Sequence, residues 1–63
     1  MKVLSIMDFA SGKIEIVEID DPVIEENHDG EIDREIESRG HRVSDCYWML
    51  TDKIDMEIHT LKR

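Results

Sequence analysis

Two short apolar runs near the start of the chain constrain its fold more than any other feature. Residues 2–9 and 13–20 are rich in β-branched and long apolar side chains, show no helical periodicity and flank Ser11-Gly12. We therefore expect them to form a β-hairpin. Because register follows the hydrophobic pattern, we favour a two-residue turn, which pairs Phe9 with Ile14, Met7 with Ile16, Ile6 with Val17 and Leu4 with Ile19.

This pairing makes both faces of the hairpin apolar, because side chains alternate between the faces of a strand. It also sets Asp8 opposite Glu15, and like charges in that position are mildly destabilising. Both faces need cover. One face holds Phe9, Met7, Ile14 and Ile16, and the other holds Leu4, Ile6, Val17 and Ile19.

All of the net charge of −8 lies in residues 20–37. This segment holds nine carboxylates and one base, Arg34, whereas the rest of the chain holds seven acids and seven bases, which cancel. A segment with one sign of charge creates a local field and is the main functional pointer in the sequence.

The acidic segment has the signals of a helix. Asp20-Asp21-Pro22 combines an aspartate N-cap with a proline at the first helical position, and Gly40 is a plausible end. We predict a helix over Glu31–Arg39, with residues 22–29 forming a first turn followed by a kink or a loop. The apolar stripe consists of Ile24, Ile32 and Ile36, Glu35 is spaced to pair with Arg39, and Asp33 and Glu37 repel.

Strand character returns after Gly40. Residues 42–50 read as a strand, Thr51-Asp52-Lys53 as a turn, and Ile54–Ile58 alternates cleanly between apolar and acidic side chains. A two-residue turn places Tyr47 and Met49 beside the last strand, whereas a three-residue turn places Cys46, Trp48 and Leu50 there. We favour the second because Trp48 and Leu50 bury more apolar surface.

The order of these elements predicts an α+β fold. We expect one small ββαββ domain over residues 1–63, with an antiparallel sheet of up to four strands and one helix packed on one face. Its parts are a hairpin at 2–20, an acidic helical segment at 21–39 and a second hairpin at 41–61.

A single short helix covers only one face of such a sheet, and an exposed apolar face usually marks an interface. A 63-residue chain also has a small core of its own. We therefore expect a homodimer or a higher homo-oligomer. The residues expected to take part in interactions are Glu31, Asp33, Glu35 and Glu37 on the helix and Met7, Phe9 and Tyr47 on the strands.

Residues 25–33 place acidic and amide side chains at alternating positions around Gly30 and resemble the core of an EF-hand calcium loop. The resemblance implies calcium ligands at Glu25, Asn27, Asp29 and Asp33, with the Glu31 carbonyl between them. The pattern departs from the family at its last position, which requires a bidentate glutamate and holds Ile36. We interpret the segment as a solvated acidic helix start, with calcium binding as an alternative.

No pattern for catalysis or for a metal or cofactor site stands out. His28, His41 and His59 are widely spaced, and we interpret them as surface residues. Cys46 is the single cysteine, which excludes a disulfide within the chain, and we interpret it as a small buried hydrophobe. P-loop, dinucleotide and nucleophile-elbow motifs are absent. We predict no cofactor and no enzymatic activity.

The composition favours a soluble cytoplasmic protein, since the chain has neither a signal-peptide pattern nor an apolar run long enough to span a membrane. Its acidity argues against direct nucleic-acid binding. The function expected is a non-catalytic interaction or regulatory module that self-associates, with a basic protein as a further possible partner. The alternatives are an acidic nucleic-acid mimic that occupies a basic partner, and calcium binding through residues 25–36.

Overall fold

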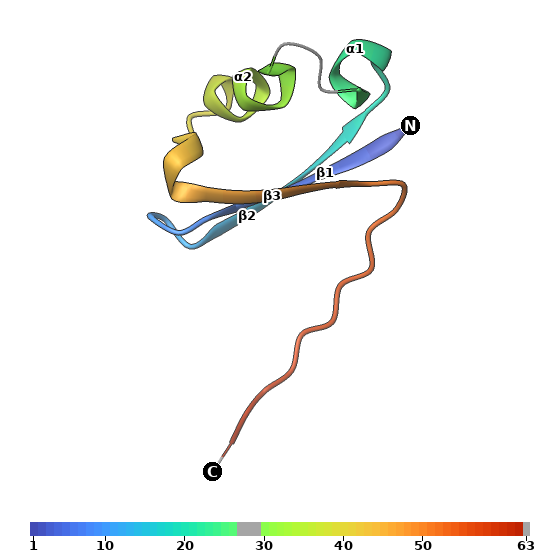
Figure 1. Ribbon diagram of the computed structural model, residues 1–63. Helices are drawn as coiled ribbons and strands as arrows, with labels where there is room; N and C mark the ends of the chain where they lie inside the picture. The colour runs from blue at the N-terminus through green and yellow to red at the C-terminus, as the bar shows by residue number, and fades with distance from the viewer. Residues whose placement is uncertain (27–29, 63) are drawn as a thin grey trace.

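The computed structural model describes residues 1–26 and 30–62, which form a small α+β domain (Figure 1). A three-stranded antiparallel sheet has the strand order β2-β1-β3, with the helices on one side of it. The predicted fold class is confirmed. The elements are β1 (Lys2–Asp8), β2 (Lys13–Ile19), α1 (Pro22–Glu25), α2 (Glu31–Ser38), the 3-10 helix η2 (Val43–Asp45) and β3 (Cys46–Thr51).

The first hairpin forms, but the predicted register is wrong by two residues. Asp8 pairs with Lys13, so the loop spans residues 9–12, twice the predicted length. Asp8 and Glu15 are therefore not directly opposite each other. A slip of two residues leaves each strand side chain on its original face, so the face assignments are correct for the strand residues. Phe9 lies in the loop.

The chemistry of Asp8 explains the longer loop. Its carboxylate oxygen Oδ1 accepts hydrogen bonds from the backbone N–H groups of Ala10 and Ser11, at 2.9 and 3.3 Å, and its carbonyl accepts one from Gly12 at 2.8 Å. Aspartate stabilises turns in this way, and Gly12 adopts the positive φ of 74° with which the loop ends. These bonds outweigh the apolar pairing of Phe9 with Ile14.

The second predicted hairpin, 41–61, does not form within the described residues. β3 pairs with β1 instead, and the residues described after Thr51 contain no strand; they extend away from the sheet in Figure 1. Pairing with β1 sets Trp48 opposite Ile6 and Leu50 opposite Leu4. β3 thereby joins an established sheet and core, whereas an isolated two-stranded hairpin is only marginally stable.

The core lies between the sheet and α2. Ile32 and Ile36, one helical turn apart, are fully buried. The predicted apolar stripe and the helix end near Gly40 are thus borne out, and α2 ends one residue before the predicted Arg39. The buried residues of this cluster are Leu4, Ile6, Val17, Ile19, Ile32 and Ile36, with Ile24, Val43, Cys46, Trp48 and Leu50 packed at its edge.

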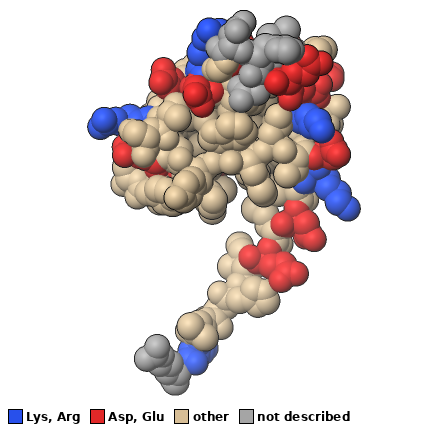
Figure 2. Space-filling view, viewed as in Figure 1, with Lys and Arg blue, Asp and Glu red and all other residues tan. Residues whose placement is uncertain are grey.

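The described acidic side chains of α2 lie on the outer side of this layer. In Figure 2 the carboxylates gather around the helices and along the C-terminal segment, while a broad area on the lower side of the body carries little charge. Asp33 and Glu37 are exposed on α2, as its helical periodicity requires when Ile32 and Ile36 face the sheet. No described helix is long and apolar enough to cross a membrane.

Candidate functional site

The turn that ends α2 places His41 beside one end of the sheet. Gly40 has a φ of 87°, its N–H donates to the Glu37 carbonyl at 3.0 Å, and the N–H of His41 donates to the Ile36 carbonyl at 3.3 Å. These two bonds define a Schellman motif, which requires a left-handed residue at the position of Gly40. The chain therefore turns sharply, and His41 enters the layer between helix and sheet.

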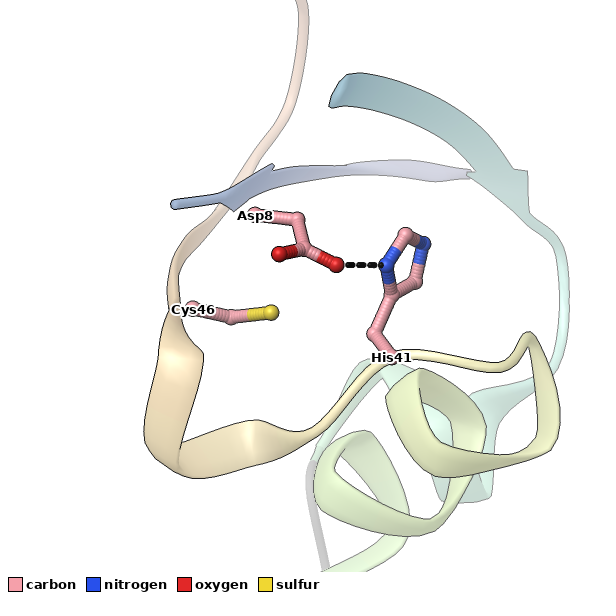
Figure 3. A group of neighbouring side chains, drawn as sticks. All are labelled: Asp8, His41 and Cys46. Atoms are coloured by element: carbon pink, nitrogen blue, oxygen red, sulfur yellow. Dashed lines mark hydrogen bonds and ion pairs between the residues drawn. The ribbon is translucent and has the colours of Figure 1, made fainter. Parts of the chain in front are cut away.

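His41 is buried between two carboxylates. Its Nδ1 lies 2.7 Å from Asp8 Oδ2, a contact drawn in Figure 3, and its Nε2 lies 2.8 Å from Glu15 Oε1. Asp8 ends β1 and Glu15 belongs to β2, so the imidazole joins the end of the helix to the first hairpin. The prediction that His41 is a surface residue is wrong, because its side chain is only 5% exposed.

The two carboxylates favour the charged form of the ring. A neutral imidazole donates through one nitrogen, whereas an imidazolium donates through both and satisfies both acceptors. The bond to Asp8, followed by that to Glu15, raises the pKa of His41 above its usual range. In return, the bond to His41 is the largest cause that lowers the pKa of Asp8 and of Glu15.

Arg39 extends this network to the helix. Its Nη1 lies 2.8 Å from Glu15 Oε2, and its Nε lies 2.9 Å from Glu35 Oε1. The predicted pairing of Glu35 with Arg39 is confirmed. Each oxygen of Glu15 therefore meets a different donor, and this carboxylate is held on both sides.

Cys46 completes the cluster from the third strand. It pairs directly with Asp8 across β1 and β3, and its thiol points toward the Asp8 carboxylate and the His41 ring (Figure 3). One ligand atom from each of Asp8, His41 and Cys46 lies within 4.8 Å of the others. Burial, followed by the charges of Asp8 and Asp45, raises the pKa of the Cys46 thiol.

This geometry argues against a nucleophilic cysteine. A cysteine nucleophile needs a base to take its proton or a setting that lowers its pKa. Both nitrogens of His41 are already bonded to carboxylates, and the surroundings of Cys46 raise its pKa. The arrangement is better suited to holding a cation among Asp8, His41 and Cys46 than to attacking a substrate.

The residues predicted to interact occupy two separate surfaces. Met7 and Tyr47 are cross-strand neighbours on the sheet face away from α2, and the rings of Phe9 and Tyr47 meet edge-to-face with centroids 4.9 Å apart. On α2, Glu31 pairs with Arg34 and Glu35 with Arg39. In the described part of the chain, Asp33 and Glu37 have no base within ion-pair distance. The acids and the apolar residues therefore face opposite sides of the molecule.

The calcium candidates are only partly described. Glu25 lies in α1, near the Met1 amino group at 3.3 Å, and Asp33 lies in α2. Asn27 and Asp29 lie outside the described residues, as does His28. Ile36, at the last position of the resembling loop, is a fully buried helix residue. The remaining predicted surface histidine, His59, is exposed beside Glu57.

No family model, no curated protein and no solved structure matches this chain.

The cluster around His41 was missed by sequence reasoning, although two features of the sequence point to it. Asp8 and Glu15 share a face of the hairpin, and two nearby carboxylates on a largely apolar face call for a compensating cation. Gly40 is a helix-end signal, and His41 follows it directly, at the point where the chain turns back toward the sheet. The combination of these two features indicates the pairing.

Proposed function

We propose that this protein is a non-catalytic interaction module that self-associates by packing the uncovered faces of two sheets together. The observation that carries this proposal is the exposure of large apolar side chains on that face. The exposed fractions are 43% for Met7, 60% for Ile14, 37% for Ile16, 67% for Tyr47 and 49% for Met49. Contiguous apolar surface of this kind marks protein interfaces.

The distribution of charge supports a second copy as the occupant. The exposed apolar residues of this face come from alternate positions of three neighbouring strands, and Glu18 is the charged residue among those positions, at one end. The described residues of the segment that carries the net charge of −8 lie on the other side of the sheet. Two copies stacked through their sheets keep their acidic segments apart, since helices then form the two outer layers.

The geometry also suits stacked sheets. Antiparallel sheets pack face to face about 10 Å apart with interdigitating side chains. A shallow hollow beside this face, lined in part by Ile14, Ile16, Ile54 and Met56, offers room for a large side chain of the second copy. The acidic face of α2 then selects or repels other partners, including a basic protein, because charge at a rim mainly governs rate and specificity.

Molar mass measured by light scattering and sedimentation at micromolar concentration tests this proposal. We expect a dimer for the wild type and a monomer for Ile14→Glu, which places a carboxylate among the exposed apolar side chains of this face, on the edge strand β2. Leu61→Glu is the matched control, because Leu61 is 91% exposed and lies in the C-terminal segment; it should remain a dimer. A wild-type monomer, or a dimer that persists in Ile14→Glu, overturns the proposal.

Salt dependence separates the two kinds of contact. Two copies of an acidic molecule repel, so salt should strengthen an apolar dimer by screening that repulsion. An interface formed by the acidic helix with a basic partner should weaken instead. Self-association that falls as salt rises therefore contradicts the sheet-to-sheet arrangement.

A further inference from the structure

Among the described residues, one group has the composition of a transition-metal site. Asp8, His41 and Cys46 come from the end of β1, the turn after α2 and the start of β3, and their ligand atoms lie within 4.8 Å of one another. The side chain of His41 is 5% exposed and that of Asp8 is 10% exposed. Three different metal ligands therefore converge from distant parts of the chain, two of them nearly buried and Cys46 partly buried (Figure 3).

We propose that Asp8, His41 and Cys46 bind one Zn²⁺-like divalent ion. A thiolate, an imidazole nitrogen and a carboxylate oxygen are the donors that Zn²⁺ takes, whereas Ca²⁺ and Mg²⁺ take oxygen ligands. This site is distinct from the sheet face of the proposed function and does not depend on self-association.

The side chains need only small movements to take up the ion. Zinc–ligand lengths of about 2.0 to 2.3 Å in a tetrahedron place ligand atoms about 3.3 to 3.6 Å apart. The contact of 2.7 Å between Asp8 Oδ2 and His41 Nδ1 must widen, and the thiol of Cys46 already lies within 4.8 Å of the ligand atoms of Asp8 and His41. In the metal-free protein the hydrogen bond between Asp8 and His41 occupies that place.

The surroundings already orient the ligands. Histidines that bind metals through one ring nitrogen usually donate from the other to a carboxylate. His41 Nε2 does so to Glu15 at 2.8 Å, and Arg39 fixes the second Glu15 oxygen at 2.8 Å, so Nδ1 is the nitrogen left for the ion. Asp8 is likewise oriented, because its other oxygen accepts the N–H groups of Ala10 and Ser11.

The charges balance when the ion replaces protons. Two acceptors face the His41 ring, so we take the metal-free cluster as two carboxylates, from Asp8 and Glu15, one imidazolium and one protonated thiol. Binding Zn²⁺ requires a neutral imidazole and a thiolate, so two protons leave as two positive charges enter. The net charge of the buried cluster is unchanged, and no new uncompensated charge is buried. The described residues supply three ligands, and a water completes the tetrahedron.

Titration of the chelator-treated full chain with Co²⁺, followed by competition with Zn²⁺, tests this site. We expect one Co²⁺ per chain with a thiolate-to-cobalt charge-transfer band and the intense visible bands of a tetrahedral ion. Zn²⁺ should abolish these bands, and excess Mg²⁺ or Ca²⁺ should not. Absence of the thiolate band, or its loss to Mg²⁺, overturns the proposal.

Three variants locate the ion. Cys46→Ser should abolish the charge-transfer band while preserving the circular dichroism spectrum. Glu15→Gln should keep the band but weaken Co²⁺ binding by about 10- to 100-fold, the usual effect of losing the carboxylate behind a ligating histidine. His59→Gln is the control, since His59 is exposed, and it should leave affinity unchanged. Equal affinity in Cys46→Ser, or a loss of binding in His59→Gln, places the ion elsewhere and overturns the assignment.

Discussion

The two faces of the sheet are built from alternate residues of the same strands, yet one face is covered by the helices and the other is not. On one face, Leu4 and Ile6 are fully buried beneath α2. On the other, Met7 and Ile14 are exposed, although Val3 and Ser5 on the same face are buried. The side chains are equally apolar, so the difference comes from the single eight-residue helix, which is long enough to cover only one side. The second face is therefore the exposed apolar surface that is available for binding a partner.

The ends of the covered face also differ. Along most of its length it is closed by apolar contacts, whereas near the hairpin loop it is closed by His41 and its two carboxylates. The stability gained from buried apolar side chains does not depend on pH. The stability gained from His41, Asp8 and Glu15 does, because it depends on the charges of these side chains. Substitutions on the two faces should therefore differ in their effect on stability, and so should changes at the apolar part and the polar end of the covered face.

The largest effect is expected for truncation of the helix anchor. Ile36→Ala removes a fully buried side chain and should destabilise the protein by about 2 to 5 kcal/mol, which approaches the whole stability of a small domain. Ile14→Ala on the open face is the matched control and should change the stability of a monomer by less than about 1 kcal/mol. Urea unfolding followed by circular dichroism measures both. Similar losses in the two variants would show that both faces are covered equally.

Local patterns in the sequence predict the local structure well. The apolar spacing of Ile32 and Ile36, the end signal at Gly40 and the alternation in the first hairpin each act within a few residues. The register of that hairpin was missed because a slip by two leaves the hydrophobic pattern of each face intact. The hydrogen bonds that Asp8 makes in the loop decide it instead.

Non-local pairing is where sequence reasoning fails. β3 has an apolar face that fits either β1 or the alternating residues that follow it, and only the assembled core favours β1. The cluster of Asp8, His41 and Cys46 is likewise invisible in sequence spacing, because it requires a strand end, a helix end and a third strand to meet. A prediction of metal ligands from spacing alone therefore finds residues 25–33 and overlooks these three.

Because His41, Asp8 and Glu15 close one end of the covered face, we expect the stability of the protein to vary with pH. The raised pKa of His41 means that its contribution is complete below the ordinary value of 6.5 and is lost as pH rises through the folded-state pKa. The lowered pKa values of Asp8 and Glu15 mean that their contributions are complete above about 4.5 and are lost as pH falls through their folded-state values. With Lys13, Arg39 and Cys46 among its titratable neighbours, the cluster should stabilise the metal-free protein most between about pH 4.5 and 6.5.

Melting midpoints from pH 3 to 9, measured in the presence of a chelator, test this expectation. His41→Asn should lower the midpoint by on the order of 5 °C near the optimum and flatten the profile. His59→Asn, which alters an exposed histidine, should reproduce the wild-type profile. A His41→Asn profile as steep as that of the wild type would assign the pH dependence to other groups.

The smallest effect is expected at the turn that places His41. Gly40→Ala adds a Cβ that meets open space, so its cost is the strain of a φ of 87°, about 1 to 2 kcal/mol. Gly40→Asn is the matched comparison, because asparagine tolerates the left-handed region and should recover much of that loss. Urea unfolding measures the stability of both variants, and cobalt titration measures their effect on the cluster. Because the turn sets where His41 lies, alanine should weaken Co²⁺ binding more than asparagine. Equal behaviour of the two variants would mean that His41 is held by its carboxylates alone, and that the Schellman turn follows from this pairing rather than directing it.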